Sequence, residues 1–251
     1  MTDFEIFETL PSTQTLAIER LRAGKTGPGW VLTREQTQGV GRHGRAWVGT
    51  RGNFMASRYE AMAIDIRNVP QLSFITALAL YEMLRPLVPD TDEALRIKWP
   101  NDVLHKGRKL AGILVQTEAG FDADRLGIVI GMGVNLAAAP AIDAYPTCAL
   151  RDISDQPRVD PVAFLHRFDG HLNGALQLWR DKGFEDIARA WLKRAYGRDM
   201  RLSLSYEGKA ISGRLKDLDP FGALRIVGDD GETYAITGGD ITYGALHAAG
   251  D

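Results

Sequence analysis

Up to residue 198, the spacing of apolar and polar positions predicts a mixture of helices and strands. Apolar residues at helical spacing predict helices over residues 13–23, 72–87, 162–180 and 184–195. Short apolar or alternating runs predict extended segments over residues 30–33, 53–66, 95–99, 112–118 and 126–134. The turn-forming pair Lys106-Gly107 predicts a hairpin between residues 103–104 and 109–110. The pattern is typical of an α+β fold.

The pattern changes after Gly197. Short alternating runs follow over residues 201–206, 210–215, 223–227 and 233–236. Turn residues separate them, and the spacing is close to ten residues, which is typical of a small antiparallel barrel. We therefore expect a first domain over residues 1–198 and a second over residues 199–251.

The composition excludes several classes of protein. The chain has 251 residues, with 30 basic and 32 acidic side chains and a net charge of −2. A nucleic-acid coat or a membrane-surface protein needs a basic excess, so we expect neither partner. The single cysteine, Cys148, cannot form an internal disulfide or a thiolate metal cage. The amino terminus has no secretory pattern, and the longest charge-free stretch, residues 126–142, is broken by glycines and a proline. These features predict a cytoplasmic protein.

Positive charge is concentrated in two short segments. Residues 34–58 hold five arginines and one acid, Glu35, and residues 96–110 hold five basic residues and one acid, Asp102. Each segment carries a net +4, so the rest of the chain carries −10. Two such segments predict a site for a compact anion, although two solvated loops are the alternative.

The first basic segment contains Gly39-Val-Gly41-Arg42-His-Gly44, which matches G-x-G-x-x-G. More glycines and arginines follow in place of a helix, so a dinucleotide-binding turn is disfavoured. Glycines let backbone N–H groups approach an anion, and arginines add charge-assisted hydrogen bonds. Arg42, Arg45 and Trp47 favour a clamp that orders on binding over a flexible surface loop.

The second segment contains Lys98-Trp-Pro-Asn101-Asp102. Its amide and carboxylate stand at the end of a strand, as adenine recognition or proton handling would require. A tight hairpin would bring Lys109 back beside Asp102. The alternative is a solvated hairpin whose ion pairs contribute little.

Taken in order, these segments resemble the biotin–protein ligases. The resemblance rests on residues 12–14, 35–47, 98–102, 109–114 and 131–135, and it covers nearly the whole chain. It implies a catalytic domain like that of class II aminoacyl-tRNA synthetases, with a mixed sheet and helices, followed by an SH3-like barrel. Because the chain begins at the catalytic domain, it resembles the monofunctional type without an N-terminal DNA-binding domain.

The resemblance implies two half-reactions. Biotin and ATP, with Mg²⁺ carried on the nucleotide, give biotinyl-5′-AMP and pyrophosphate. The acyl group then passes to one lysine of a biotin carboxyl carrier protein. No protein-caged metal is expected, and the enzyme would be a monomer or a homodimer.

The resemblance also assigns site residues. Catalytic roles fall to Lys109, Arg42, Asp102 and Lys98. Contacts to biotin fall to Ser12, Thr13, Gln14, Gln36, Val40, Gly41, Arg42, Lys109 and Gly112. Contacts to ATP or the adenylate fall to Gly39, Arg42, Arg45, Trp47, Asn101, Lys109 and Asn135.

The chain departs from the family pattern at three of these motif positions. Val40 stands where a second arginine is usual, His43 where arginine is frequent, and Gln14 where asparagine is usual. Three alternatives remain open: a lipoate–protein ligase, octanoyl transfer through Cys148, and a non-catalytic module that binds a partner.

Overall fold

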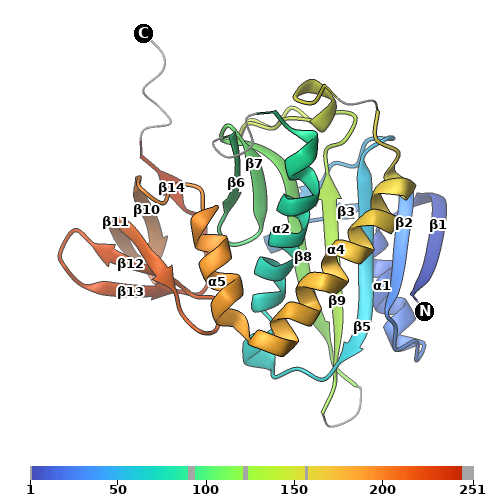
Figure 1. Ribbon diagram of the computed structural model, residues 1–251, viewed down its shortest axis with the longest axis horizontal. Coiled ribbons are helices and arrows are strands. Elements are labelled where there is room, and N and C mark those ends of the chain that lie inside the picture. The colour runs from blue at the N-terminus through green and yellow to red at the C-terminus, as the bar shows by residue number, and fades with distance from the viewer. Residues whose placement is uncertain (1, 90–93, 121–123, 156–157, 245–251) are drawn as a thin grey trace.

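One mixed sheet of seven strands forms the centre of the larger part of the protein (Figure 1). The computed structural model describes residues 2–89, 94–120, 124–155 and 158–244. In spatial order the strands are β1 (Asp3–Leu10), β2 (Gly29–Gln36), β5 (Phe54–Met62), β9 (Leu126–Val134), β8 (Arg108–Glu118), β7 (Asp102–His105) and β6 (Leu95–Lys98). Strand β1 runs parallel to β2, and the other neighbouring pairs are antiparallel.

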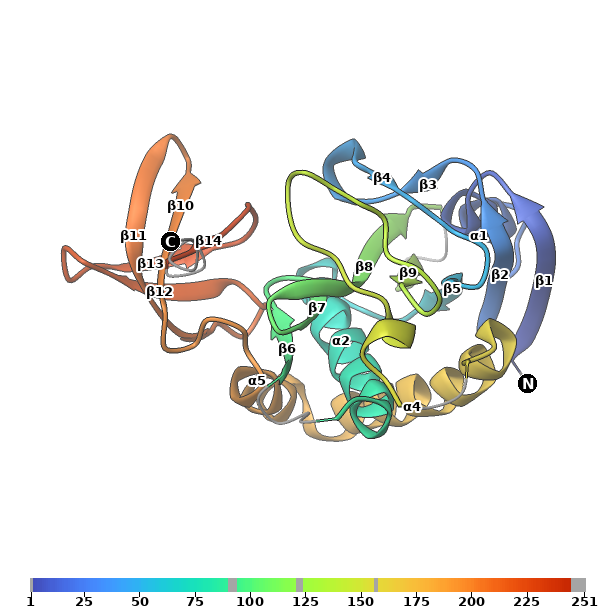
Figure 2. The same cartoon turned by 90° about the horizontal axis from the view of Figure 1, so that it is seen from above.

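Helices cover the sheet unequally (Figure 2). Helix α1 (Thr13–Arg22) packs on one face, and α2 (Gln71–Leu84), α4 (Pro161–Lys182) and α5 (Phe184–Lys193) pack on the other. Helix α2 is apolar on nearly all sides because it lies between the sheet and the other two helices. Within the described ranges, no helix is long and apolar enough to cross a lipid bilayer.

Most of the predicted elements are present, with differences that have physical reasons. Helix α2 ends at Leu84, before the predicted end at residue 87, because Pro86 has no N–H to continue the hydrogen bonding. Strand β8 is continuous where two short strands were expected. Strand β1 was not predicted, because an edge strand that leaves Ile6 exposed gives only a weak apolar pattern.

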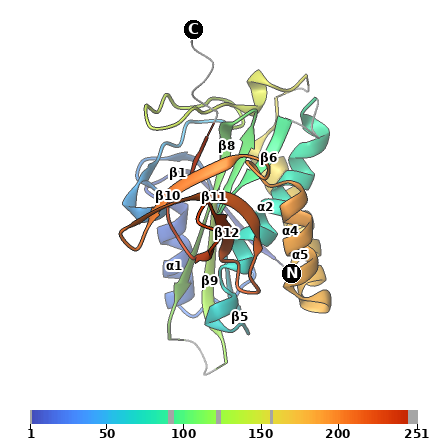
Figure 3. The same ribbon diagram turned by 90° about the vertical axis from the view of Figure 1, so that its left-hand side faces the viewer.

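The carboxyl-terminal residues form a separate antiparallel sheet beside β6 (Figure 3). Its strands are β10 (Arg201–Tyr206), β11 (Lys209–Leu218), β12 (Leu224–Gly228), β13 (Thr233–Ile236) and β14 (Thr242–Tyr243). The first four match the predicted alternating runs, and the sheet agrees with the expected small barrel. Residues 245–251 of the expected second domain lie outside the described residues.

Specific contacts hold this second sheet against the first. The Gln71 side-chain amide donates to the Pro220 carbonyl at 2.8 Å, and the Trp99 indole donates to the Gly222 carbonyl at 3.4 Å. The Phe74 ring lies against Gly222 from the side of α2. These contacts place the turn between β11 and β12 beside α2 and beside the segment that follows β6.

Candidate functional site

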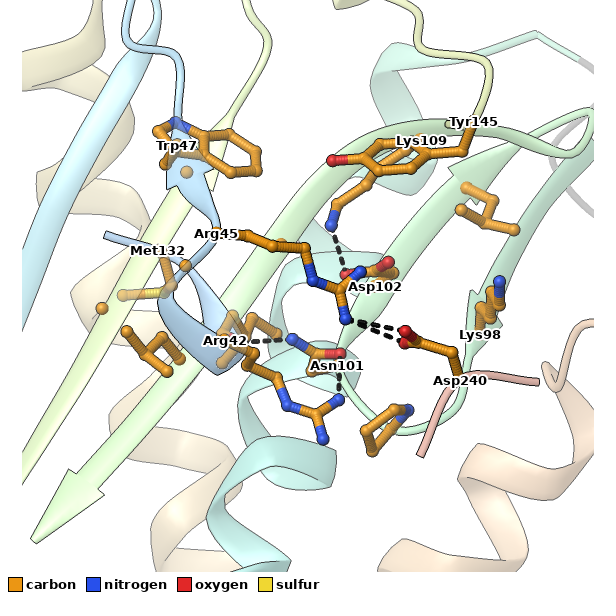
Figure 4. Close-up of a pocket in the computed structure, with 18 of the residues that line it drawn as sticks. Arg42, Arg45, Trp47, Lys98, Asn101, Asp102, Lys109, Met132, Tyr145 and Asp240 are labelled. Carbon is orange, nitrogen blue, oxygen red and sulfur yellow. Dashed lines mark hydrogen bonds and ion pairs between the residues drawn. The ribbon is translucent and has the colours of Figure 1, made fainter. Parts of the chain in front are cut away.

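A cavity of about 670 Å³ lies on the α1 side of the sheet, and Figure 4 shows its charged centre. A hairpin of β3 (Gly39–Val40) and β4 (Ala46–Trp47), which we call the lid hairpin, contributes to its wall. The lining includes these predicted residues: Ser12, Thr13, Gln14, Gln36, Val40, Gly41, Arg42, Arg45, Trp47, Lys98, Asn101, Asp102, Lys109 and Gly112. Two basic segments that are distant in the sequence therefore meet in one cavity.

One end of the cavity is a network of uncharged polar groups over β2, β5 and β9. The Thr13 backbone N–H donates to Gln36 Oε1 at 2.9 Å, and Thr13 Oγ1 lies 2.9 Å from Ser57 Oγ. The Ser57 hydroxyl donates to Gln14 Oε1 at 3.0 Å, and Gln14 Nε2 donates to Gln116 Oε1 at 2.8 Å. Because these side chains are neutral and mostly buried, they suit a neutral polar ligand group.

Ser12 fixes the start of α1 beside this network. Its hydroxyl accepts from the Thr15 backbone N–H at 3.3 Å, so it caps the helix. The cap places the next two side chains, Thr13 and Gln14, over the sheet with little exposed surface.

Glycines form the floor of the cavity. Gly112 on β8 and Gly133 on β9 are cross-strand partners, and the Trp47 indole lies over both. A Cβ atom on Gly133 would overlap that indole, and one on Gly131 would overlap the Gln14 side chain. Position 133 must therefore be glycine for the lid hairpin to close against the floor, and position 131 must be glycine for Gln14 to keep its place. The Trp47 indole N–H is buried and has no hydrogen-bond partner among the described residues.

Lys109 and Asp102 form the centre of the cavity. Lys109 Nζ lies 2.8 Å from Asp102 Oδ1, as the predicted hairpin required, and both side chains are less than a fifth exposed. The Lys109 ammonium also lies 5.7 Å from the centroid of the Trp47 ring and 5.2 Å from that of Tyr145. The pair is thus enclosed, which argues against the solvated hairpin that was its alternative.

Further cations surround this pair. Arg42 Nη1 donates to Asn101 Oδ1 at 3.2 Å, and the Asn101 amide donates to the Ile113 carbonyl at 2.6 Å. Burial lowers the pKa of Arg42, and the nearby carboxylates of Asp102 and Asp240 offset part of this effect. Burial likewise lowers the pKa of the Lys98 ammonium. Arg42, Lys98 and Lys109 therefore concentrate positive charge in a partly buried cavity, which favours the binding of an anion.

Two predicted site residues do not line the cavity. Asn135 is buried, and its amide donates to the Cys148 carbonyl at 3.2 Å and the Lys109 carbonyl at 3.5 Å. Gly39 lies against the Trp47 backbone and the Gln36 side chain, where a Cβ would overlap both. Both residues hold their neighbours in place.

The first basic segment does not act as one cluster. Arg58 is buried and pairs with Asp169 at 3.0 Å and Glu60 at 2.8 Å, and it is not part of the cavity lining. Arg34 and Arg51 pair with Glu8 at 3.1 and 2.8 Å. Of the five arginines in that segment, Arg42 and Arg45 line the cavity.

The sequence reasoning missed several lining residues. Ser57 and Gly131 gave only a weak signal, a polar residue and a glycine within otherwise apolar strands. Tyr196, Asp240 and Tyr243 gave none, because the packing of the second sheet against the first brings them to the cavity.

Comparisons with known proteins agree on one family. Residues 6–135 match the model of the "Biotin/lipoate A/B protein ligase family", and residues 201–244 match "Biotin protein ligase C terminal domain". A biotin–[acetyl-CoA-carboxylase] ligase of Paracoccus denitrificans is 38% identical over 84% of this chain and 89% of that protein. One of Mycobacterium tuberculosis is 31% identical over 92% and 85%.

A solved structure shares the fold. The biotin protein ligase from Aquifex aeolicus in complex with biotin and ATP aligns with a TM-score of 0.75 at 22% identity, over 96% of this chain and 98% of that one.

Proposed function

Because this chain belongs to the biotin/lipoate A/B protein ligase family, we propose that it is an ATP-dependent biotin–[biotin carboxyl carrier protein] ligase. Biotin and MgATP form biotinyl-5′-AMP and release pyrophosphate. The amine of one carrier lysine then attacks the mixed anhydride and releases AMP. The carrier belongs to acetyl-CoA carboxylase or a similar biotin-dependent enzyme.

The observation that carries this proposal is the meeting of Arg42, Lys98 and Lys109 in one cavity with a neutral polar end. In the first step a carboxylate must approach a phosphate, and two unit charges 4 Å apart repel by about 4 kcal/mol at an effective dielectric constant of 20. Three preorganised cations lower that repulsion and stabilise charge on the phosphate oxygens.

The neutral network supports biotin as the acyl substrate. Biotin ends in an uncharged ureido ring that both donates and accepts hydrogen bonds. We propose that this ring binds at a group of residues near the amino terminus of α1: Ser12, Thr13, Gln14 and Gln36. Val40, Gly41 and Gly112 would flank the acyl chain, which leads towards Arg42 and Lys109 at the carboxylate.

The nucleotide would occupy the other side of the charged centre. Asn101 would contact adenine, and Arg45 and Trp47 would cover the adenylate from the lid hairpin. We propose that Gly39 and Asn135 act only by positioning Trp47 and the strand that carries Lys109. The closed lid would exclude water from the mixed anhydride.

Asp102 is the proposed base for the second step. An incoming lysine is protonated and must lose a proton before it attacks. The Asp102 carboxylate can accept that proton once Lys109 turns to the adenylate.

Two alternative activities have less support. Lipoate and octanoate carry no ureido group, so either would leave the network around Thr13 and Gln14 without a ligand partner. Octanoyl transfer needs a thiolate, whereas Cys148 is buried away from the cavity lining, and burial raises the pKa of its thiol to about 11. An enclosed charged cavity also argues against a purely partner-binding module.

We propose that residues 1–198 form the catalytic domain and residues 199–251 the second domain. A cytoplasmic location, the lack of nucleic-acid and membrane partners, and a monomer or homodimer stay predictions.

The test is ATP–pyrophosphate exchange with biotin, lipoate and octanoate compared side by side. We expect exchange with biotin alone. Exchange driven by lipoate or octanoate at a similar rate would reject the assignment of the acyl substrate, and no exchange with any of the three would reject the ligase itself.

A further inference from the structure

Two buried tyrosines, Tyr196 and Tyr243, line the end of the cavity that adjoins the second sheet. Tyr196 is 8% exposed and Tyr243 is 5% exposed. Neither hydroxyl has a hydrogen-bond partner among the described residues. Because native proteins rarely leave a buried polar group unpaired, two together at a cavity wall point to a ligand that completes them.

The surrounding residues fix both rings in place. The Tyr196 and Tyr243 rings pack edge to face, with centroids 5.2 Å apart. Gly197 has a φ of 72°, and a Cβ atom there would overlap the Tyr243 ring. The Tyr196 backbone N–H donates to the Ile97 carbonyl of β6 at 2.8 Å. Packing from both sheets therefore holds the two rings in place beside the cavity.

The chemistry of this end suits an anion. Lys98 Nζ lies 5.6 Å from the centroid of the Tyr243 ring. Burial raises the pKa of both Tyr196 and Tyr243, so each keeps its proton and stays a donor. Two acids lie near Lys98, and each is paired with another cation: Asp102 with Lys109 at 2.8 Å, and Asp240 with Arg45 at 2.9 Å.

The position of this end follows from the order of strands. The neutral network lies over β2, β5 and β9, the Lys109–Asp102 pair on β8 and β7, and the two tyrosines beyond β6. Four strand spacings, roughly 19 Å, separate β5 from β6. The two ends of the cavity therefore lie on opposite sides of the charged centre.

From this arrangement we infer that Tyr196 and Tyr243, with Lys98, bind the pyrophosphate leaving group. The inference rests on the proposed function. A biotin carboxylate oxygen forms a bond to the α-phosphorus while the bond from that phosphorus to the bridging oxygen breaks. The electron pair leaves with that oxygen on pyrophosphate, and Mg²⁺ arrives with ATP. In-line displacement sends the leaving group away from the acyl chain, towards the end that holds the tyrosines.

The tyrosines are binding residues for one half-reaction only. Formation of biotinyl-5′-AMP and its reversal involve pyrophosphate, whereas transfer to the carrier lysine does not. Loss of either hydroxyl should therefore affect the first step and spare the second.

The experiment uses Tyr196→Phe and Tyr243→Phe in the full chain, because each change removes one oxygen and keeps the ring. In biotin-dependent exchange, we expect the KM for pyrophosphate to rise about tenfold in each variant, as for a lost hydrogen bond to a charged group. The KM for biotin and the rate of transfer from preformed biotinyl-5′-AMP to the carrier should stay at the wild-type values.

Tyr206→Phe is the matched control. This tyrosine is in the same sheet, its hydroxyl pairs with Thr237, and it does not line the cavity. Unchanged KM values for pyrophosphate in both cavity variants would overturn the inference, as would a raised KM for the carrier alone. If the wild-type chain shows neither exchange nor transfer, the proposed function fails instead, so the two failures are distinguishable.

Discussion

Arg45 of the lid hairpin forms an ion pair with Asp240, which lies between β13 and β14 of the second sheet, at 2.9 Å between Nη2 and Oδ2. The two residues are far apart in the chain, and the pair spans the cavity wall (Figure 4). Burial acts to raise the pKa of Asp240, but the hydrogen bond and charge of Arg45 outweigh it and hold that pKa below its ordinary value. The second sheet is therefore an anchor for the lid hairpin.

Removal of this anchor by Asp240→Ala should loosen the lid without unfolding the protein. Both side chains are at least half exposed, so the free energy of unfolding should change by less than about 1 kcal/mol. Biotinyl-5′-AMP should dissociate severalfold faster, as a filter-binding assay would measure. Asp229→Ala breaks an ion pair with Arg201 on the same sheet and serves as the control. Equal dissociation rates in both variants would refute the anchor.

Arg42→Gly should release the adenylate even faster. The guanidinium is partly buried and holds Asn101, and its loss removes a charge-assisted contact to the adenylate. We expect the dissociation rate of biotinyl-5′-AMP to rise roughly tenfold or more, with acylation of bystander lysines. Arg67→Gly is the control, because it changes an exposed arginine that is paired with Asp65. It should neither speed the dissociation of biotinyl-5′-AMP nor cause acylation of bystander lysines. Slow release from the Arg42 variant would contradict its proposed role.

Lys109→Ala should lower biotin-dependent exchange about 100-fold or more, because it removes a preorganised cation from the reacting phosphate. It also leaves the Asp102 carboxylate enclosed without its partner, at a cost of about 1–3 kcal/mol in the free energy of unfolding. The double variant Lys109→Ala with Asp102→Asn should recover the stability, measured by urea unfolding, but not the exchange. Recovery of exchange would show that Lys109 serves the fold alone.

The hairpin that joins Lys109 to Asp102 could be predicted from the sequence, because Lys106-Gly107 is a local turn signal between two short strands. The sequence could not show which arginines of the first basic segment line the cavity and which form ion pairs elsewhere. Arg58 and Arg42 look alike in the sequence, but one points to Asp169 across the core and the other into the cavity. Charge counts along a chain carry no information about which face of a strand a residue occupies.

Asn135 shows a second limit. Its motif assigns it to the nucleotide, yet its amide holds the backbone of Lys109 and Cys148. Tyr196 and Tyr243 show a third, because their position depends on how two sheets pack, and no local pattern encodes that packing.

Gly133→Ala should disturb the lid hairpin through the floor. The added Cβ overlaps the Trp47 indole, and overpacking of this kind costs about 1–3 kcal/mol in the closed arrangement. Biotin binding, measured by calorimetry, should weaken accordingly. Gly170→Ala in α4 adds a methyl group to open space and should slightly stabilise the helix while biotin binding stays the same. Wild-type affinity in the Gly133 variant would rule out close packing of Trp47 on the floor.

The exchange reaction should lose activity at alkaline pH sooner than an ordinary lysine would allow. Burial first, and then the charges of Lys109 and Arg45, lower the pKa of Lys98 from 10.5, while Asp102 and Asp240 act in the opposite direction. As the pH rises, Lys98 therefore loses its charge before pH 10.5 is reached. The alkaline limb of the pH–rate profile should also lie below pH 10.5. Between the lowered pKa of Lys98 in the folded protein and 10.5, the unfolded chain binds more protons than the folded one. In this interval Lys98 therefore makes the free energy of unfolding rise with pH.

The variant Lys98→Arg tests whether the charge of Lys98 sets the alkaline limb of the exchange profile. Arginine keeps its charge throughout the alkaline range, so the falling limb of the exchange profile should move to higher pH. If the limb stays in place, another group controls it.

Gly112 and Gly133 lie under the Trp47 indole, and the shape of the cavity there depends on the lack of side chains at these two positions. The indole is a bulky side chain that limits how wide an acyl group can pass along the floor. A smaller side chain at position 47 would open a slot there without any change to Lys109 or Asp102. This makes Trp47 the place to begin if the protein is to be redesigned to label carrier lysines with broader carboxylic acids, such as those that bear chemical handles.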